Sequence, residues 1–307
     1  MRAFLKAWLW LSLCCCILHC GGGEPAQHGE ARSSVVYGED DRKEPYEYPV
    51  DSPLRAWARS SAIMMGTTDL RGDDERELML GVEQTFSEEM AASGKPLCPE
   101  EPFQDEPALD GLCSAFLVAP DVVVTAGHCV VSAGVCPNLA FVFGAGYDQP
   151  DRDPRRIRTD DVYFCRDVPA LVEDDAQGDY AVVKLDRPVV GREPLPLRRT
   201  GKVSDDEELV LIGNPAGLPT KIAAHGAVLD NASPRFFAAS VDSYGGNSGS
   251  VVMGLRSGLV EGILARGETD FVRQGDCWMS KVCPADGGSC RGEDVTRATE
   301  VAPHIPG

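Results

Sequence analysis

The sequence predicts an all-β protein built as an antiparallel sandwich or barrel, and two observations carry that prediction. From Cys113 onward, short apolar runs rich in Val, Ile, Leu and Phe recur at intervals of roughly ten residues, and they are too short for helices. Gly, Pro, Asn and Asp separate these runs, as expected for turns between neighbouring strands. The expected strands are 114–119, 122–126, 140–143, 180–185, 209–212, 221–229, 236–241 and 259–264.

The bulk composition is that of a globular protein and limits its partners. The 307 residues are 43% hydrophobic and 25% charged, which are ordinary values for a folded chain. This length suits one domain of about 200 to 270 residues, or two fused barrels, preceded by a leader. The formal net charge is −19 at pH 7. Because phosphate binding needs local positive charge, this balance argues against a nucleic-acid partner.

The first twenty residues predict a secretory signal peptide. Arg2 and Lys6 supply a positive start, and the apolar run 7–18 is too short to span a bilayer. The sequence from His19 through Cys20 into three glycines resembles a bacterial lipoprotein signal in which Cys20 is acylated, although His19 departs from that pattern. Plain cleavage nearby is the alternative. We therefore expect an exported protein, either secreted or tethered to a membrane through a lipid on Cys20.

The composition of the chain changes twice after the leader. Residues 21–34 are Gly-rich and polar and predict a flexible linker. Residues 35–112 form an N-terminal segment in which 54–65 fits a strand or a short helix, and 75–92 is charged and loosely helical. Residues 113–307 are expected to form the main part of the folded domain, with 292–304 as a closing helix.

The cysteines fit an oxidising compartment. Eight of the twelve lie beyond the leader: Cys98, Cys113, Cys129, Cys136, Cys165, Cys277, Cys283 and Cys290. An even number in an exported chain indicates up to four disulfides, whose pairing the sequence leaves open. A zinc site at Cys277, Cys283 and Cys290 is the competing hypothesis, but no pair has the two-residue spacing of zinc ribbons. We expect no metal and no cofactor.

Three segments place reactive side chains beside apolar strands. Residues 123–129, Val-Val-Thr-Ala-Gly-His-Cys, end an apolar run with His128. Asp179 opens the run 180–185, and Ser248 lies in the glycine-rich loop Tyr-Gly-Gly-Asn-Ser-Gly-Ser. Small residues in such a loop let the backbone turn sharply and bring amides close to a ligand. Taken singly, each of the three has an ordinary explanation as a turn or cap residue.

Together the three residues predict a catalytic triad. A serine hydroxyl is a poor nucleophile unless an imidazole takes its proton, and the imidazole needs a carboxylate to set its tautomer. The order His, Asp, Ser has gaps of 51 and 69 residues, which leave room for strands that return to a shared cleft. An α/β-hydrolase would need Gly-x-Ser-x-Gly followed by Asp and then His. Here Ser250 replaces the second Gly and only His304 follows, so that fold is disfavoured.

At these motifs the sequence resembles the trypsin/chymotrypsin superfamily of serine proteases, over about residues 113–267. Asn247 before the serine, and the stretch Val-Tyr-Gly-Glu-Asp-Asp-Arg at 36–42, are similar to the bacterial branch that includes glutamyl endopeptidases. The resemblance implies two antiparallel six-stranded β-barrels with the active site between them. His128 and Asp179 would come from the first barrel and Ser248 from the second.

The same resemblance implies further site features. The amides of Gly246 and Ser248 would form the oxyanion hole, which stabilises the charge that develops in the transition state. Cys113 and Cys129 match the disulfide that braces the histidine loop in many members. Asn247 replaces the aspartate that pairs with the new amino terminus in trypsin, so activation by that switch is not expected.

Substrate preference depends on the residues of the primary pocket. Asp242 stands six residues before Ser248, where trypsin has the aspartate at its pocket floor, and it favours Arg or Lys before the scissile bond. Arg266 and Gly267 lie on the strand expected to form the pocket wall, and Arg266 would oppose that preference by neutralising Asp242 or by attracting an acidic side chain. That strand lacks the histidine of glutamyl endopeptidases.

These observations predict an exported serine endopeptidase that hydrolyses protein or peptide substrates through an acyl-enzyme and acts as a monomer. His128 would be the general base, Asp179 would orient it, and Ser248 would be the nucleophile. One alternative is a catalytically inactive binding protein on the same fold, although such proteins usually lose the serine or the histidine. The other is a lipid-tethered surface adhesin, which only the acidic charge and the leader support.

Overall fold

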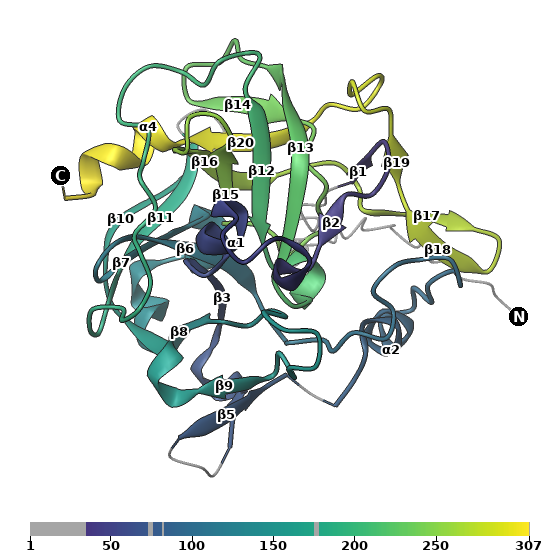
Figure 1. Ribbon diagram of the computed structural model, residues 1–307, viewed down its shortest axis with the longest axis horizontal. Coiled ribbons are helices and arrows are strands. Elements are labelled where there is room, and N and C mark those ends of the chain that lie inside the picture. Colours follow the sequence, from purple (N-terminus) through teal and green to yellow (C-terminus); the bar gives the residue numbers. More distant parts are fainter. Residues whose placement is uncertain (1–34, 73–75, 82, 175–177, 307) are drawn as a thin grey trace, which may run out of the picture. The chain divides into compact units, whose positions relative to one another are not determined.

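The computed structural model describes residues 35–72, 76–81, 83–174 and 178–306 (Figure 1). The expected signal peptide at 1–20, the linker at 21–34 and Cys20 lie outside these residues and remain predictions. In the part of the chain that is described, no helix is both long and apolar enough to cross a bilayer. The fold is mostly β, with two closed six-stranded antiparallel barrels, which confirms the predicted class.

The first barrel joins strands from both sides of the histidine motif. Its strands are β3 (Ser61–Gly66), β6 (Cys113–Ala119), β7 (Val122–Thr125), β8 (Leu139–Phe143), β10 (Val162–Asp174) and β11 (Gly178–Leu185). They are ordered β10-β11-β7-β6-β3-β8 and close where β8 pairs with β10. Alternate residues of all six strands fill the interior, including Met64, Leu117 and Phe141. The other faces of β6, β7 and β11 pack against the second barrel, so these strands are buried on both sides.

The second barrel follows in sequence and receives one N-terminal strand at its edge. Its strands are β12 (Glu208–Gly213), β13 (Lys221–Asp230), β14 (Phe236–Ala239), β15 (Val251–Gly254), β16 (Val260–Arg266) and β20 (Glu293–Arg297). They are ordered β12-β15-β16-β20-β14-β13 and close where β12 pairs with β13, while β2 (Arg42–Lys43) adds to the edge of β13. Leu211, Phe237 and Val295 are among the interior side chains. Figure 1 shows β12 and β13 in green beside the purple β2.

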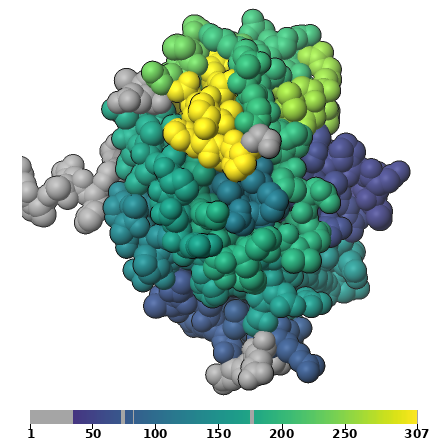
Figure 2. Space-filling view, turned by 90° about the vertical axis from the view of Figure 1, so that its left-hand side faces the viewer, coloured from purple at the N-terminus to yellow at the C-terminus, as the bar shows by residue number. Residues whose placement is uncertain are grey.

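A single apolar cluster joins the two barrels and holds the C-terminus. It contains Val124 and Val182 of the first barrel and Val251 and Ile263 of the second. The helix α4 (Ala298–Val301) and the 3₁₀ turn η6 (Ala302–His304) pack on the same cluster through Val301. The yellow C-terminal segment is visible at the surface in Figure 2, bordered by green and teal segments. Its end is fastened where the Tyr180 hydroxyl lies 3.3 Å from His304 Nε2.

The expected closing helix over 292–304 is only partly present. Residues 293–297 form strand β20 between β14 and β16, and the helix begins at Ala298. Its charged sequence, Glu-Asp-Val-Thr-Arg, has only one large apolar residue, so it carries no strong strand signal. Pairing on both sides decided its conformation, because both barrel neighbours need its backbone hydrogen bonds.

Residues 35–112 combine short peripheral elements with one barrel strand. The region 54–65 contains both structures that the sequence allowed, α1 (Pro53–Ala58) and then β3. The region 75–92 is a strand followed by a helix, β5 (Glu77–Leu80) and α2 (Phe86–Ala92). Across the whole described chain, the remaining short elements are β1 (Val36–Tyr37), η1 (Pro45–Glu47), η2 (Thr67–Asp69), β4 (Leu70–Arg71), α3 (Gly127–Val130), η3 (Ala133–Asn138), β9 (Arg156–Arg158), η4 (Thr159–Asp161), η5 (Pro215–Gly217), β17 (Phe271–Gln274), β18 (Cys277–Ser280) and β19 (Val282–Cys283).

Four disulfides use all eight cysteines beyond the leader. The pairs are Cys98–Cys277, Cys113–Cys129, Cys136–Cys165 and Cys283–Cys290. The three C-terminal cysteines of the competing zinc hypothesis are therefore bonded to other cysteines and do not offer thiolate ligands. The pair Cys113–Cys129 links β6 to α3, the helix that begins just before His128.

Candidate active site

His128 and Asp179 are brought together by two neighbouring strands of the first barrel. Strand β7 ends at Thr125, which lies opposite Ala181 of β11, and α3 carries His128 just beyond this point. His128 Nδ1 lies 2.7 Å from Asp179 Oδ2, and the His128 backbone N–H donates to Asp179 Oδ1 at 3.0 Å. The carboxylate thus binds both the ring and the backbone of the histidine. An Nδ1–H that donates to Asp179 leaves Nε2 as the proton acceptor.

Glycine is required before the histidine because the chain passes very close to its neighbours. A Cβ on Gly127 would lie 2.0 Å from the carbonyl oxygen of Val172 and 3.0 Å from Asp179 Oδ1. Steric crowding therefore explains why the Thr-Ala-Gly-His motif has a glycine at position 127. A larger residue would push the histidine loop away from β10 and β11.

Asp179 is also held from the second barrel. Its backbone N–H donates to Thr296 Oγ1, and that hydroxyl donates to the carbonyl oxygen of Asp179, both at 3.2 Å. Thr296 lies on β20 and is buried, as is Asp179. Sequence analysis missed this threonine because the segment was assigned to a helix. No local pattern could have placed it beside a residue 117 positions earlier.

The serine loop is clamped against the strand that leads to the histidine. The Ser114 N–H of β6 donates to the carbonyl oxygen of Ser248 at 2.8 Å. Gly249 has φ +85°, and a Cβ there would lie 2.1 Å from the Ser114 carbonyl oxygen and 2.3 Å from Thr125 Oγ1. Only glycine tolerates this conformation at this approach. Ser248 is 9% exposed, and its loop is thus brought from the second barrel to the end of β7.

Asn247 holds the loop from within. Its Oδ1 accepts from the Ser250 hydroxyl at 2.7 Å, and its Nδ2 donates to Ser243 Oγ at 3.0 Å. The Ser250 N–H donates to the Asn247 carbonyl oxygen at 2.9 Å. A neutral amide serves this site well because it both donates and accepts. The hydrogen bonds that Asn247 makes within the loop are therefore all between neutral groups.

Hydrogen bonds made by Gly245 fix the orientation of the peptide unit between Gly245 and Gly246. The Gly245 N–H donates to Asp270 Oδ2 at 3.0 Å, and its carbonyl oxygen accepts from the Ala216 N–H at 2.6 Å. Because the two ends of a peptide unit point in opposite directions, the Gly246 N–H is directed away from Ala216. Within the described residues, neither the Gly246 nor the Ser248 N–H donates to a backbone carbonyl. Both amides are thus available to a ligand.

Asp242 is turned toward the N-terminal segment. Its carboxylate accepts from the Tyr37 N–H at 2.6 Å and from the Asp41 N–H at 2.9 Å, and only 4% of the residue is exposed. Burial raises the pKa of Asp242, while these two amides act in the opposite direction. The Ser243 N–H also donates to the Val35 carbonyl oxygen at 3.0 Å. The predicted pocket-floor residue is therefore also an anchor for residues 35–41.

Arg266 makes an ion pair with Asp294, its register partner on β20, with Nε and Oδ2 3.7 Å apart. The carboxylate beside the expected pocket wall belongs to Glu293, which is completely buried. A Cβ on Gly267 would lie 1.8 Å from Glu293 Oε2, so the glycine makes room for this carboxylate. Glu293 also accepts from the Tyr37 hydroxyl at 3.5 Å. Sequence analysis missed Glu293, because it lay in the segment expected to be helical.

One group of metal-ligand side chains occurs among the described residues, and its chemistry does not suit a metal. Cys113, His128 and Cys129 offer ligand atoms within 4.8 Å of one another. The two sulfurs are joined in a disulfide, which removes the thiolates that bind zinc. The cluster is a consequence of the bridge beside the histidine.

Comparison with known proteins agrees with this geometry. Residues 113–263 match the family model of the trypsin-like peptidase domain. Among solved structures, the chain is similar to a Glu endopeptidase, with a TM-score of 0.50 and 16% identity over 88% of this chain and 96% of that one. A serine endoprotease from Yersinia pestis gives a TM-score of 0.47 and 14% identity over 82% of this chain and 63% of that one. No curated protein matches the sequence.

Proposed function

We propose that Ser248, His128 and Asp179 form the catalytic triad of this chain, a serine endopeptidase of the trypsin/chymotrypsin-like superfamily. The observation that carries the proposal is the double contact of the Asp179 carboxylate with His128, through the ring at 2.7 Å and the backbone at 3.0 Å. The clamping of the Ser248 loop onto β6 and β7 supports it further.

The proposed mechanism uses each group for one task. His128 Nε2 takes the proton of the Ser248 hydroxyl as its oxygen attacks the scissile carbonyl carbon, and Asp179 stabilises the imidazolium that forms. The amides of Gly246 and Ser248 donate to the oxyanion of the tetrahedral intermediate. The imidazolium then protonates the leaving amine, and water hydrolyses the acyl-enzyme with His128 again as base.

A covalent label would test the triad directly. A fluorophosphonate probe should react with Ser248, and peptide mapping should find the probe on that residue. Ser248→Ala should abolish labelling, whereas Ser204→Ala, at an exposed serine outside the candidate site, should retain it. Absence of labelling in the folded wild type would instead favour an inactive binding protein or an adhesin.

We also propose a preference for Arg or Lys at the residue before the scissile bond. Glu293 supports it, because its fully buried carboxylate lies against Gly267 of the expected pocket wall, whereas the Asp242 carboxylate already accepts from two backbone amides of the N-terminal segment. A carboxylate beside the pocket wall attracts a cationic side chain and repels an acidic one, so a guanidinium or ammonium group would be favoured there. The pairing of Arg266 with Asp294 supports the view that Arg266 does not reverse this preference.

Chromogenic peptides that differ only before the scissile bond would test the preference. We expect kcat/KM to be higher for Arg and Lys than for Ala or Glu. Glu293→Gln should reduce the Arg-over-Ala ratio by about tenfold or more. Glu268→Gln is a nearby control just beyond β16, because the Glu268 carboxylate is ion-paired with Lys281. Faster cleavage after Glu than after Arg would overturn the proposal.

We further propose that the enzyme works outside the cytoplasm, as a monomer, either secreted or lipid-anchored through Cys20. Four disulfides support an oxidising compartment. Metabolic labelling with an alkyne fatty acid would separate the two forms, because Cys20→Ala would abolish a lipid signal. Light scattering of the purified enzyme would test the monomer.

A further inference from the structure

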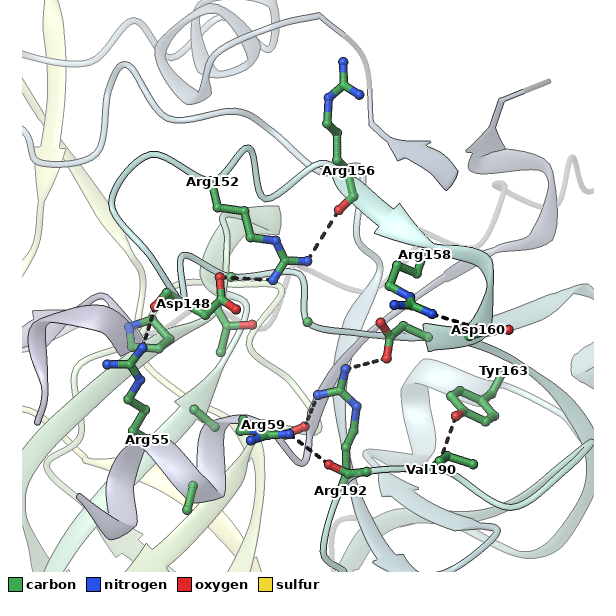
Figure 3. Close-up of a pocket in the computed structure, with 18 of the residues that line it drawn as sticks. Arg55, Arg59, Asp148, Arg152, Arg156, Arg158, Asp160, Tyr163, Val190 and Arg192 are labelled. Atoms are coloured by element: carbon green, nitrogen blue, oxygen red, sulfur yellow. Dashed lines mark hydrogen bonds and ion pairs between the residues drawn. The ribbon is translucent and has the colours of Figure 1, made fainter. Parts of the chain in front are cut away.

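An arginine-lined cavity lies apart from the candidate active site. It has a volume of about 1180 Å³ and is bordered by α1, by β9, by the loop that precedes β9, and by residues 187–192 (Figure 3). None of the triad, oxyanion or primary-pocket residues lines it. A ligand in this cavity would therefore leave the reacting groups accessible.

The side chains that line the cavity carry a net positive charge, whereas the chain as a whole is strongly negative. Seven arginines and five carboxylates line it, which leaves two positive charges in excess, although the chain as a whole carries −19. This local excess of positive charge attracts anionic ligands. Arginine suits carboxylates in particular, because its planar group donates two parallel hydrogen bonds to them.

Some of these arginines are ion-paired within the protein, and others have no carboxylate partner among the described residues and can bind a ligand. Arg192 is paired with Asp161, and Arg187 is stacked on Tyr163 and paired with Asp186. These two guanidinium groups hold the loops that form the wall.

Arg55 and Arg59 differ from them. Arg55 donates to the Asp148 carbonyl oxygen at 2.5 Å, and Arg59 donates to the Gly191 carbonyl oxygen at 2.9 Å. Within the described ranges, neither arginine forms an ion pair. Their orientation is thus set by backbone carbonyls while their charge is not neutralised by a carboxylate.

Arginines on two walls of the cavity are arranged to bind one ligand together. Arg55 and Arg59 are four residues apart in and after α1, so they extend from the same side of the helix. Figure 3 shows Arg152 across the cavity from them, held by Asp148 with Nη1 and Oδ1 3.1 Å apart. A ligand with two or three carboxylates would contact both sides.

We propose that this cavity is a docking site for a short acidic segment of the protein substrate. It exceeds the size needed for a single inorganic anion, and it is comparable to the largest pockets that bind organic ligands. A long polyanion would extend beyond the cavity over a chain of net charge −19 and be repelled, whereas two to four acidic residues remain inside the positive region. The inference rests on the proposed function only for the identity of the ligand as substrate.

Binding measured without catalysis tests the site. Fluorescence anisotropy would compare a labelled peptide containing four consecutive glutamates with the same peptide containing four glutamines, using the Ser248→Ala protein. We expect the glutamate peptide to bind at least about tenfold more tightly at low salt, with an advantage that shrinks as salt is raised. Arg55→Gln with Arg59→Gln should remove most of this advantage. Arg273→Gln is the matched control, an exposed arginine on β17 outside the cavity, and should leave it unchanged.

Activity gives a second and separable readout. In the active enzyme, the double variant should raise KM for a protein substrate that carries an acidic segment. It should leave kcat/KM for a short chromogenic peptide within about twofold of wild type, since it removes only binding outside the cleft. Arg152→Gln, on the opposite wall, provides an independent variant should the double variant unfold. Equal binding of the two peptides would overturn the docking site. So would an unchanged advantage of the glutamate peptide in the variants on both walls. Neither result would affect the assignment of the triad.

Discussion

The two sides of the active-site cleft are held in different ways. On the first-barrel side, His128 and Asp179 lie at the ends of adjacent strands, and a disulfide between residues only 16 apart braces the histidine loop. On the second-barrel side, Asp242 is bound by backbone amides of Tyr37 and Asp41, 205 and 201 residues earlier in the chain. The first side thus depends mainly on adjacent strands and a covalent bridge, with a long-range contact from β20 to Asp179, whereas the second side depends on long-range polar contacts.

This difference predicts different sensitivities. The second-barrel side contains buried ionisable groups whose charges must be balanced by partners from the N-terminal segment. Lys221 is only 2% exposed and is paired with Glu44 and Glu106. Burial and Glu106 raise the pKa of Glu44 to about 8, while Lys221 opposes this shift. We therefore expect pH and charge changes to affect this side more than the first.

The largest effect is expected on the first-barrel side, for Asp179→Asn. The amide retains an oxygen for the His128 backbone N–H but presents an N–H to Nδ1, which forces the ring into the wrong tautomer. In proteases with this triad the same change lowers kcat by about 10⁴. Assays with a chromogenic peptide at neutral pH would measure it. The thermal midpoint serves as a control for folding, and a kcat within tenfold of wild type would contradict the assigned role.

Lys221→Met should have the largest effect on stability. It leaves the buried Glu44 and the partly buried Glu106 side by side without their cation, and breaking a buried ion pair in this way costs about 3 to 5 kcal/mol in the free energy of unfolding. Denaturant titration at pH 7 would measure the loss. Adding Glu44→Gln and Glu106→Gln to the same variant should restore a large part of it. A loss below 1 kcal/mol would show that the buried pairs do not contribute as we infer.

Removal of the Cys113–Cys129 bridge should cost slightly less. For a loop of this length the chain-entropy model gives about 3 kcal/mol. The variant Cys113→Ser with Cys129→Ser should also lose activity, because the bridge holds the loop of His128. Cys283→Ser with Cys290→Ser is a matched control that opens a bridge away from the histidine and should keep kcat. Equal kinetic losses in both variants would argue against a local effect.

The last effect is expected at Asp41; it is absent near pH 4 and grows as the pH rises. Burial and the charge of Asp242 raise the pKa of Asp41 to about 8, against about 4 in an unfolded chain. Between these values the unfolded chain has released a proton that the folded protein retains, so stability from this group falls as pH rises from about 4 to about 8.

Asp41→Asn removes that dependence and keeps a donor toward Asp242. The variant should match wild type near pH 4 and become more stable than wild type as the pH rises toward 8. Thermal midpoints at pH 4, 6 and 8 would test this, with Asp40→Asn as the neighbouring control. A variant less stable than wild type at pH 8 would reverse our view of the second-barrel side.

Much of the fold was predictable because barrel strands have a local signature. The expected strands 114–119, 122–126 and 209–212 agree closely with β6, β7 and β12. Strand β10 was missed because most of it is only partly buried and includes Pro169, so it lacks an apolar run. Strand β20 was missed because its charges are neutralised or hydrogen-bonded by distant residues.

The sequence by itself determined most of the strand pattern and the three local motifs that contain the candidate triad residues, because each of these depends on residues within a few positions of one another. Only the tertiary structure decided that Asp242 binds the N-terminal segment, that Glu293 lies against Gly267, and that arginines from three segments line one cavity. The physical reason is that the energy of a charge depends on its distance in space to other charges and on its burial. Both quantities are set by which strands pair in the closed barrels, and the order of residues does not contain them.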